Sequence, residues 1–316
     1  MIERPMNEET SADTRKPRAQ PSPLAPFGGA RPPAPQWFET AIATPNERRT
    51  VAVGDADIEW IGWGERGRPG LLLLHGSGGH ADWWSFIAPY LAATRRVVAL
   101  SWGGMGNSGH RNHYSMDLFV AEILAVAAAS GLTETGPFTA VGHSFGGFPM
   151  MALASRADPP LRRAIILDTP FDDRRGRPPR QREDAATRAH RIYPTMAEAL
   201  AHFRWVPPQP TPYPFIADFI ARHSLKAVPG GFTWKFDPHL WSNFSVPNRT
   251  DLLKAPRCPV TLVWGEESSL LRGELLADTI RRLPPGTPLL PIPGAHHHPM
   301  ADQPLALVTA LRALLA

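Results

Sequence analysis

The stretch Val141–Gly147, VGHSFGG, decides the fold, because it sets a serine between two glycines where a strand gives way to a helix. The preceding residues FTAV are typical of a buried strand, and the following GGFPMMALAS of a helix that tolerates Pro149 in its first turn. In this context Gly-x-Ser-x-Gly predicts a sharp turn with Ser144 at strained backbone angles. The glycines Gly142 and Gly146 are needed where neighbouring chain passes too close for side chains. Ser144 is therefore the candidate nucleophile, with helix N–H groups behind it facing a developing negative charge.

Short apolar runs alternate with helical patterns on both sides of this stretch. The expected strands are two within 48–64, then 71–75, 96–102, 138–143, 162–168, 258–265 and 287–294. The expected helices are 81–96, 115–131, 145–157, 271–283 and 304–316. This order predicts a mostly parallel α/β sheet, since strands that alternate with helices pair in parallel.

The chain divides into three parts by composition. Residues 1–36 are polar, charged and proline-rich, which predicts a flexible tail. The strand–helix alternation runs through 37–169, breaks after Asp168, and resumes over 251–316. The intervening residues 170–250 are proline-rich and aromatic, so we expect a cap inserted between two strands of one α/β core, over the edge of the sheet where ligands bind.

Overall composition narrows the functional class. The chain has 316 residues with a formal net charge of +4, which is not the one-sided basic signature of a nucleic-acid-binding protein. No run approaches the length of a membrane span, and the N-terminus lacks the apolar segment of a secretory signal. With a single cysteine, Cys258, no intrachain disulfide can form. We expect a soluble cytoplasmic protein that acts on a small molecule and has no nucleic-acid or membrane partner. The sequence does not indicate the oligomeric state.

A serine nucleophile needs a base, and PGAHHHPMADQP at 293–304 offers three histidines after the last predicted strand. With these residues the chain resembles the α/β-hydrolase family. The motifs that carry the resemblance are LLLLHGSGG, GHSFGG, VTLVWGEE and PGAHHHPMADQP, in the order and spacing of that family. The resemblance implies an α/β-hydrolase fold, a mostly parallel sheet flanked by helices with an inserted helical cap. It assigns the base to His297 rather than to His296 or His298.

The orienting acid departs from the family pattern. The family most often carries it three residues after the glycine of a motif like WGExD, and here that position holds Ser268. A subset of the family carries the acid at the end of an earlier strand, which corresponds to Asp168. The longer side chains of Glu267 or Glu266 are the alternative. We expect Asp168 to orient the histidine. Glu267 and Glu266 remain the alternative candidates for the acid.

Two backbone N–H groups are expected to form the oxyanion hole, those of Phe145 and of Ser77 in the HGSGG loop. A triad of this kind requires no cofactor. His110 and His113, together with the triple histidine, do not form a recognised zinc pattern, so the sequence predicts no metal site.

The expected activity is hydrolysis of a carboxylic ester with a small to medium hydrophobic group, through an acyl-enzyme. The aromatic residues of the cap support an apolar pocket; they are Phe203, Trp205, Phe215, Phe219, Phe232, Trp234, Phe236 and Trp241. Carbon–carbon bond hydrolysis of a diketone-like substrate is the alternative, since the HGSGG loop resembles that of such enzymes. A third hypothesis is that the protein is a non-catalytic, ligand-binding homologue.

Overall fold

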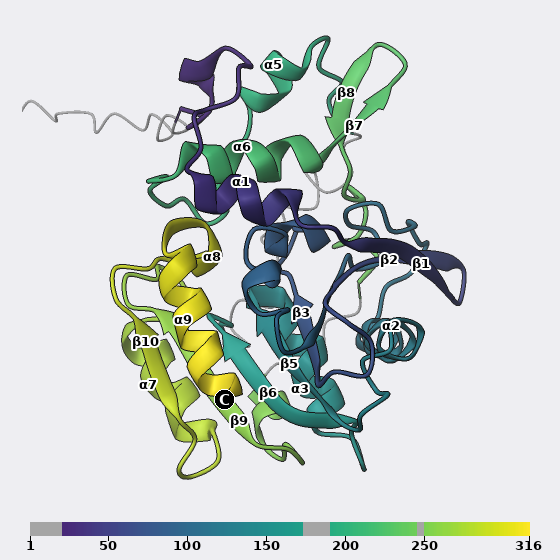
Figure 1. The fold of residues 1–316 in the computed structure, drawn as a ribbon, viewed down its shortest axis with the longest axis vertical. Helices are drawn as coiled ribbons and strands as arrows, with labels where there is room; N and C mark the ends of the chain where they lie inside the picture. The colour runs from purple at the N-terminus through teal and green to yellow at the C-terminus, as the bar shows by residue number, and fades with distance from the viewer. Residues whose placement is uncertain (1–20, 173–189, 245–249) are drawn as a thin grey trace, which may run out of the picture.

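A computed structural model describes residues 21–172, 190–244 and 250–316 (Figure 1). Its centre is an eight-stranded sheet in the order β1-β2-β4-β3-β5-β6-β9-β10. The strands are β1 (Glu47–Val53), β2 (Ala56–Trp63), β3 (Gly70–Leu74), β4 (Arg96–Leu100), β5 (Phe138–His143), β6 (Leu161–Leu167), β9 (Val260–Gly265) and β10 (Leu289–Ile292). Strand β2 is antiparallel to β1 and β4, and all other pairs are parallel. The predicted α/β fold is confirmed.

Both faces of the sheet are buried, as its continuous apolar strands require. In β3, Leu71 and Leu73 join one hydrophobic cluster while Leu72 and Leu74 join the other. Helices α2 (Met116–Ala129), α3 (Gly147–Ala154) and α7 (Gly273–Arg282) contribute to the second cluster, and α9 (Pro304–Leu315) to the first. Two short elements complete the core, α8 (Pro299–Asp302) and the 3₁₀ helix η6 (Thr250–Leu253). Helix α2 begins as predicted at Ser115, whose Oγ accepts the N–H of Leu118 at 3.2 Å.

The predicted helix at 81–96 is wrong. Two 3₁₀ helices stand there instead, η2 (Ala81–Trp84) and η3 (Ala88–Tyr90). The apolar side chains are not confined to one stripe: Trp83, Trp84 and Phe86 are all buried. Pro89 also lacks the N–H that a continuous helix would need. The segment is therefore a compact buried connection rather than an amphipathic helix.

A second layer, which we call the cap layer, lies over one end of the sheet (Figure 1). From the insertion it contains α5 (Met196–Leu200), α6 (Pro214–His223), β7 (Leu225–Val228) and β8 (Gly231–Trp234). From the N-terminal region it contains η1 (Ala25–Phe27) and α1 (Gln36–Ala43), the purple segments beside green α6. The cap is thus not wholly helical, because β7 and β8 form an antiparallel pair.

The predicted flexible tail needs correction over residues 21–35. Leu24 is buried, and the Ser22 hydroxyl donates to the Leu200 carbonyl at 2.9 Å. Arg222 of α6 donates to the Gly29 carbonyl at 2.7 Å. These contacts hold the segment on the cap layer. The prediction for residues 1–20 lies outside the described residues. No helix in the described ranges is both long and apolar enough to cross a membrane.

Candidate active site

The turn after β5 has the predicted geometry. Ser144 is a non-glycine residue at φ +51°, in the left-handed region that side chains rarely adopt. It opens the 3₁₀ helix η4 (Ser144–Gly146), which leads directly into α3. A Cβ added at Gly142 would lie 2.8 Å from the Gly146 carbonyl oxygen, and one at Gly146 would lie 2.8 Å from the Leu74 oxygen. The strained turn therefore depends on glycine at both positions.

Ser144, His297 and Asp168 form a continuous hydrogen-bonded chain. The Ser144 Oγ lies 2.9 Å from His297 Nε2, and His297 Nδ1 lies 2.8 Å from Asp168 Oδ1. Since a carboxylate only accepts, Nδ1–H donates to Asp168 and Nε2 is left as the acceptor for the serine proton. The parallel strands bring the three residues to the same edge of the sheet. Strands β5 and β6 end at paired residues, His143 and Leu167, and His297 follows β10.

Asp168, rather than a glutamate, contacts His297. It follows β6 at φ +46°, and its carboxylate accepts the Gly265 N–H at 2.9 Å and the Ser268 hydroxyl at 2.8 Å. Ser268, at the position where the family usually has its acid, thus donates to the acid supplied from elsewhere. Glu266 and Glu267 are exposed.

The other two histidines of the triple do not reach Ser144 in this arrangement. His296 turns aside to Asp302, with its Nδ1 3.0 Å from Oδ2. His298 is buried between the rings of Trp83 and Trp205, at centroid distances of 5.3 and 5.4 Å. Burial lowers the pKa of His298 well below its usual value, and the nearby Val206 carbonyl offsets this only in part, without the geometry of a hydrogen bond.

His143, inside the opening motif, is a site residue that the sequence analysis missed. Its Nε2–H donates to the His297 carbonyl at 2.8 Å, which ties the backbone of His297 to the end of β5, directly before Ser144. Burial, reinforced by the charge of His297, lowers the pKa of His143 well below its usual value, so the ring is neutral. The apolar pattern of β5 gave no signal for this contact, which joins residues 154 positions apart.

The loop after β3 lies against Ser144. A Cβ added at Gly76 would be 3.0 Å from the Cβ of Ser144, so this approach leaves little room for a side chain. His75 fixes the loop: its Nδ1–H donates to the Gly76 carbonyl at 2.7 Å, and its Nε2 accepts the Trp102 N–H at 3.1 Å. Burial lowers the pKa of His75 to about 3, which keeps the ring neutral in these roles. Ser77 follows at the exposed end of the loop, and Phe145 follows Ser144 within η4.

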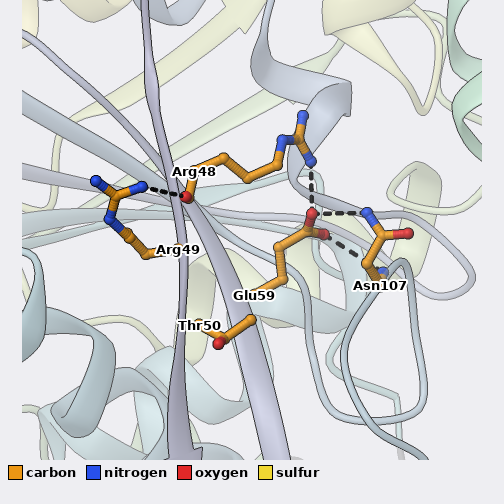
Figure 2. Close-up of a pocket in the computed structure, with 5 residues that line it drawn as sticks. All are labelled: Arg48, Arg49, Thr50, Glu59 and Asn107. Atoms are coloured by element: carbon orange, nitrogen blue, oxygen red, sulfur yellow. Dashed lines mark hydrogen bonds and ion pairs between the residues drawn. The ribbon is translucent and has the colours of Figure 1, made fainter.

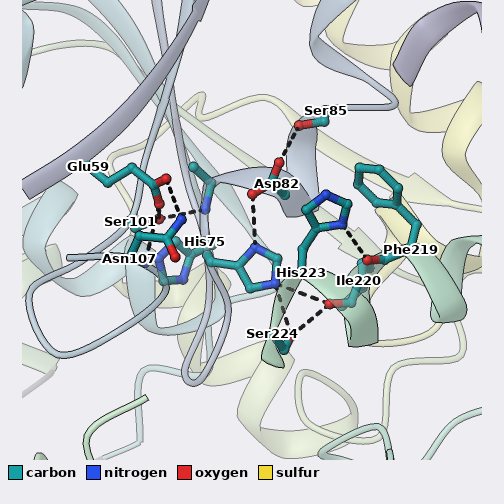
Figure 3. Close-up of polar contacts among 12 residues, drawn as sticks. Glu59, His75, Asp82, Ser85, Ser101, Asn107, Phe219, Ile220, His223 and Ser224 are labelled. Carbon is teal, nitrogen blue, oxygen red and sulfur yellow. Dashed lines mark hydrogen bonds and ion pairs between the residues drawn. The ribbon is translucent and has the colours of Figure 1, made fainter. Parts of the chain in front are cut away.

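A second Ser–His–Asp cluster connects the core with the cap layer (Figure 3). His80 Nε2 lies 2.9 Å from Ser224 Oγ, but His80 Nδ1 is 3.7 Å from Asp82 Oδ2, beyond hydrogen-bond length. The Ser224 hydroxyl donates to the Ile220 carbonyl at 2.8 Å, and its φ of −79° is unstrained. Although burial raises the pKa of Asp82, the nearby His80 ring and the hydrogen bonds from Arg48 hold it well below the usual range. This cluster ties η2 to α6 and has no activated nucleophile.

A surface cavity of about 490 Å³ lies over β1 and β2, lined by Arg48, Arg49, Thr50, Glu59 and Asn107 (Figure 2). Its charges are paired: Arg48 bonds Glu59 at 2.5 Å and Asp82, outside the lining, at 2.7 Å, and Asn107 donates to Glu59 at 2.7 Å. Arg49 lies 3.9 Å from Glu47. The cavity shares no residue with the Ser144 cluster, so its side chains stabilise this edge of the sheet rather than extend the site.

Comparison with known proteins gives partial matches to enzymes. A deacetylase named for pyrrolizixenacetamide, from Xenorhabdus hominickii, is 34% identical over 119 residues, which is 37% of this chain and 43% of the relative. A 2-hydroxymuconate semialdehyde hydrolase from Pseudomonas sp. strain CF600 is 34% identical over 102 residues, 31% of this chain and 35% of the relative. The matches therefore span less than half of either curated protein.

Two solved structures share the fold over most of the chain. An esterase from Mycobacterium tuberculosis superposes with a TM-score of 0.71 at 23% identity, covering 89% of this chain and 96% of that one. A thioesterase domain from the curacin biosynthetic pathway gives 0.70 at 24% identity, covering 84% and 99%. The family described as the alpha/beta hydrolase family matches residues 71–311. With the sheet order and the strained serine turn, this match over most of the chain shows that the protein belongs to the alpha/beta hydrolase family.

Proposed function

We propose that the protein is a serine hydrolase that cleaves a carboxylic ester of a small to medium hydrophobic substrate through an acyl-enzyme. The observation that carries this proposal is the chain of hydrogen bonds from Ser144 Oγ through His297 to Asp168, at 2.9 and 2.8 Å. Both distances lie within the range expected of a nucleophile, its base and the orienting acid. The acid, the base and the buried surroundings need no metal or cofactor for this chemistry.

The proposed reaction follows from which atoms hold protons. Ser144 Oγ attacks the ester carbonyl carbon while His297 Nε2 takes the hydroxyl proton, and Asp168 stabilises the resulting imidazolium. The backbone N–H groups of Phe145 and Ser77 hold the oxyanion. His297 then gives its proton to the departing alcohol, leaving an acyl-serine. Water, deprotonated by His297, cleaves this acyl-serine to the acid and restores Ser144.

The apolar preference rests on aromatic rings close to the three residues. The ring of Phe145 lies 5.3 Å from that of Trp241 in the segment 190–244. Beside His298, the ring of Trp205 packs against that of Trp83, with ring centroids 5.8 Å apart. An acyl or alcohol group among these rings would be held by apolar contact rather than by charge. Other aromatic residues of the insertion, including Phe215 and Phe219, pack instead on Phe38 of α1, at 4.8 and 5.8 Å.

The test is release of p-nitrophenol from esters of graded acyl length by the wild type and by Ser144→Ala. We expect turnover by the wild type that falls by several orders of magnitude in the variant, because among the described residues only the Ser144 hydroxyl bonds His297 Nε2. Thr169→Val is a matched control: its hydroxyl donates to the Ser144 carbonyl at 2.9 Å but takes no part in the proposed chemistry. Full turnover by Ser144→Ala would reject the assignment.

Carbon–carbon bond hydrolysis of a diketone-like substrate is the second candidate, favoured by the relative named as a 2-hydroxymuconate semialdehyde hydrolase. It would use the same three residues. A wild type that reacts with a serine-directed phosphonate yet hydrolyses none of the esters would favour this candidate. A protein that does neither would favour a non-catalytic, ligand-binding homologue. We keep the division into a core of 37–169 and 251–316 and a cap of 170–250 as part of the proposal, except that residues 21–43 belong to the cap layer.

A further inference from the structure

Three histidines from two separate segments converge beside Ser144. His143 ends β5, while His297 and His298 follow β10, and one imidazole nitrogen from each lies within 4.8 Å of the others. The ring centroids are 5.0 Å apart for His143 and His297, and 4.7 Å for His297 and His298. All three side chains are at least 95% buried. Nothing in the proposed ester chemistry uses His298 or the Nδ1 atom of His143.

The hydrogen bonds fix which nitrogens carry lone pairs. His143 donates through Nε2 to the His297 carbonyl, so its Nδ1 is bare, and this atom has no hydrogen-bond partner within the described ranges. That Nδ1 lies beside Gly76, where an added Cβ would be 3.1 Å from it and 3.0 Å from the Ser144 Cβ. His297 presents the lone pair of Nε2. Both ring nitrogens of His298 likewise lack a hydrogen-bond partner among the residues described.

Buried ring nitrogens without partners, as on His143 and His298, are costly, and their nearness to His297 indicates a ligand that the three rings could share. Imidazole nitrogens suit Zn²⁺ and Cu²⁺, which prefer such ligands to water, whereas Mg²⁺ and Ca²⁺ prefer oxygen. Two nitrogens on one tetrahedral zinc ion are about 3.4 Å apart, because each Zn–N bond is about 2.1 Å. Nitrogens that lie up to 4.8 Å apart must therefore move closer by up to roughly 1.4 Å, through tilting of the rings. The fourth position would lie beside the Ser144 hydroxyl.

From this geometry we infer that His143, His297 and His298 form an inhibitory site for a divalent transition metal such as Zn²⁺. The ion takes the Nε2 lone pair of His297 and leaves Ser144 without its base. Part of the inference, the loss of turnover, rests on the proposed function, whereas the binding of the ion does not. The metal here is an inhibitor rather than a cofactor. The inferred site departs from the sequence analysis, which predicted no metal site.

The first measurement is calorimetric titration of the full chain with Zn²⁺, alongside inhibition of ester turnover by Zn²⁺ and by Mg²⁺. We expect one Zn²⁺ per chain and loss of turnover over the same concentration range, with no effect of Mg²⁺. His298→Phe keeps the aromatic contacts with Trp83 and Trp205 but removes the nitrogens. It should weaken both binding and inhibition at least about tenfold, as even indirect damage to metal sites does.

His296→Phe is the matched control, because His296 belongs to the same triple histidine but faces Asp302. It should bind Zn²⁺ as the wild type does. The absorption of Co²⁺ bound to the wild type gives a check that needs no variant: intense visible bands indicate the four-coordinate buried site, and weak bands an octahedral surface ion.

The inference is overturned if millimolar Zn²⁺ does not bind, if His298→Phe binds it as the wild type does, or if His296→Phe abolishes binding. A protein that binds Zn²⁺ as expected but hydrolyses no ester would leave the metal site standing and reject the proposed function. A protein that hydrolyses esters without binding Zn²⁺ would do the reverse.

Discussion

Asp168→Asn is the substitution whose outcome follows most directly from the hydrogen bonds around the site. The backbone N–H of Gly265 donates to Oδ2 and cannot reverse, so the amide oxygen of an asparagine would stay there. The amide NH₂ would then occupy the Oδ1 position, facing His297 Nδ1 and the Ser268 hydroxyl. The hydroxyl can rotate to accept. The imidazole can accept only by moving its proton to Nε2, which abolishes its action as a base toward Ser144.

The expected loss is large and confined to chemistry. In well-studied serine triads the same exchange lowers kcat by about 10⁴, which at 1.36 kcal/mol per tenfold is about 5.4 kcal/mol of transition-state stabilisation. We expect a fall of about 10³ to 10⁴ in kcat with little change in KM. Stability should change little, because asparagine is among the residues best tolerated at the φ of +46° that this position adopts.

The assay is p-nitrophenyl ester hydrolysis at the preferred acyl length, with urea unfolding followed by circular dichroism as the check on folding. Glu267→Gln is the matched control, since Glu267 is exposed and its carboxylate makes no contact with His297. Its rate should stay within about twofold of the wild type, as for most surface changes. If Asp168→Asn keeps more than a tenth of the rate, or Glu267→Gln loses as much as it does, the assignment of the acid is wrong.

Three further outcomes are expected. Ser268→Ala removes the hydroxyl that supports the Asp168 carboxylate, and should lower kcat about tenfold and the free energy of unfolding by about 1–2 kcal/mol, measured by the same assays. Ser115→Ala removes the N-cap of α2 and should cost about 1 kcal/mol in urea unfolding with kcat unchanged. Acid should destabilise the fold: burial lowers the pKa of His75, His143 and His298 below 6.5, so the unfolded chain takes up protons that the folded chain does not. Stability is thus full above pH 6.5 and falls below it, by up to about 1.4 kcal/mol per pH unit for each histidine. Urea unfolding at pH 7.5, 6.5 and 5.5 measures this loss of stability. A free energy of unfolding that does not change over this range would contradict the prediction for His75, His143 and His298.

Errors in the predicted fold arose where local pattern and tertiary burial disagree. The run at 81–96 looked helical because it is rich in apolar residues, yet these residues are buried on all sides and form two 3₁₀ turns. Residues 21–35 looked too polar and proline-rich to order themselves. A single buried leucine, Leu24, and hydrogen bonds to Leu200 and Arg222 attach them to the cap layer. In both cases the deciding partners come from distant parts of the chain.

The sequence alone determined the elements whose geometry is local. A strand, a Gly-x-Ser-x-Gly turn and a helix follow from apolar periodicity and from the two glycines, and the strand order then delivers a histidine to the same edge of the sheet. Only the tertiary structure decided which groups meet. Asp168 and His297 are 129 residues apart, and His143 and His297 are 154 residues apart. A hydrogen bond requires a donor and an acceptor to approach within about 3 Å, and the way the strands stack sets that distance while spacing along the chain leaves it open.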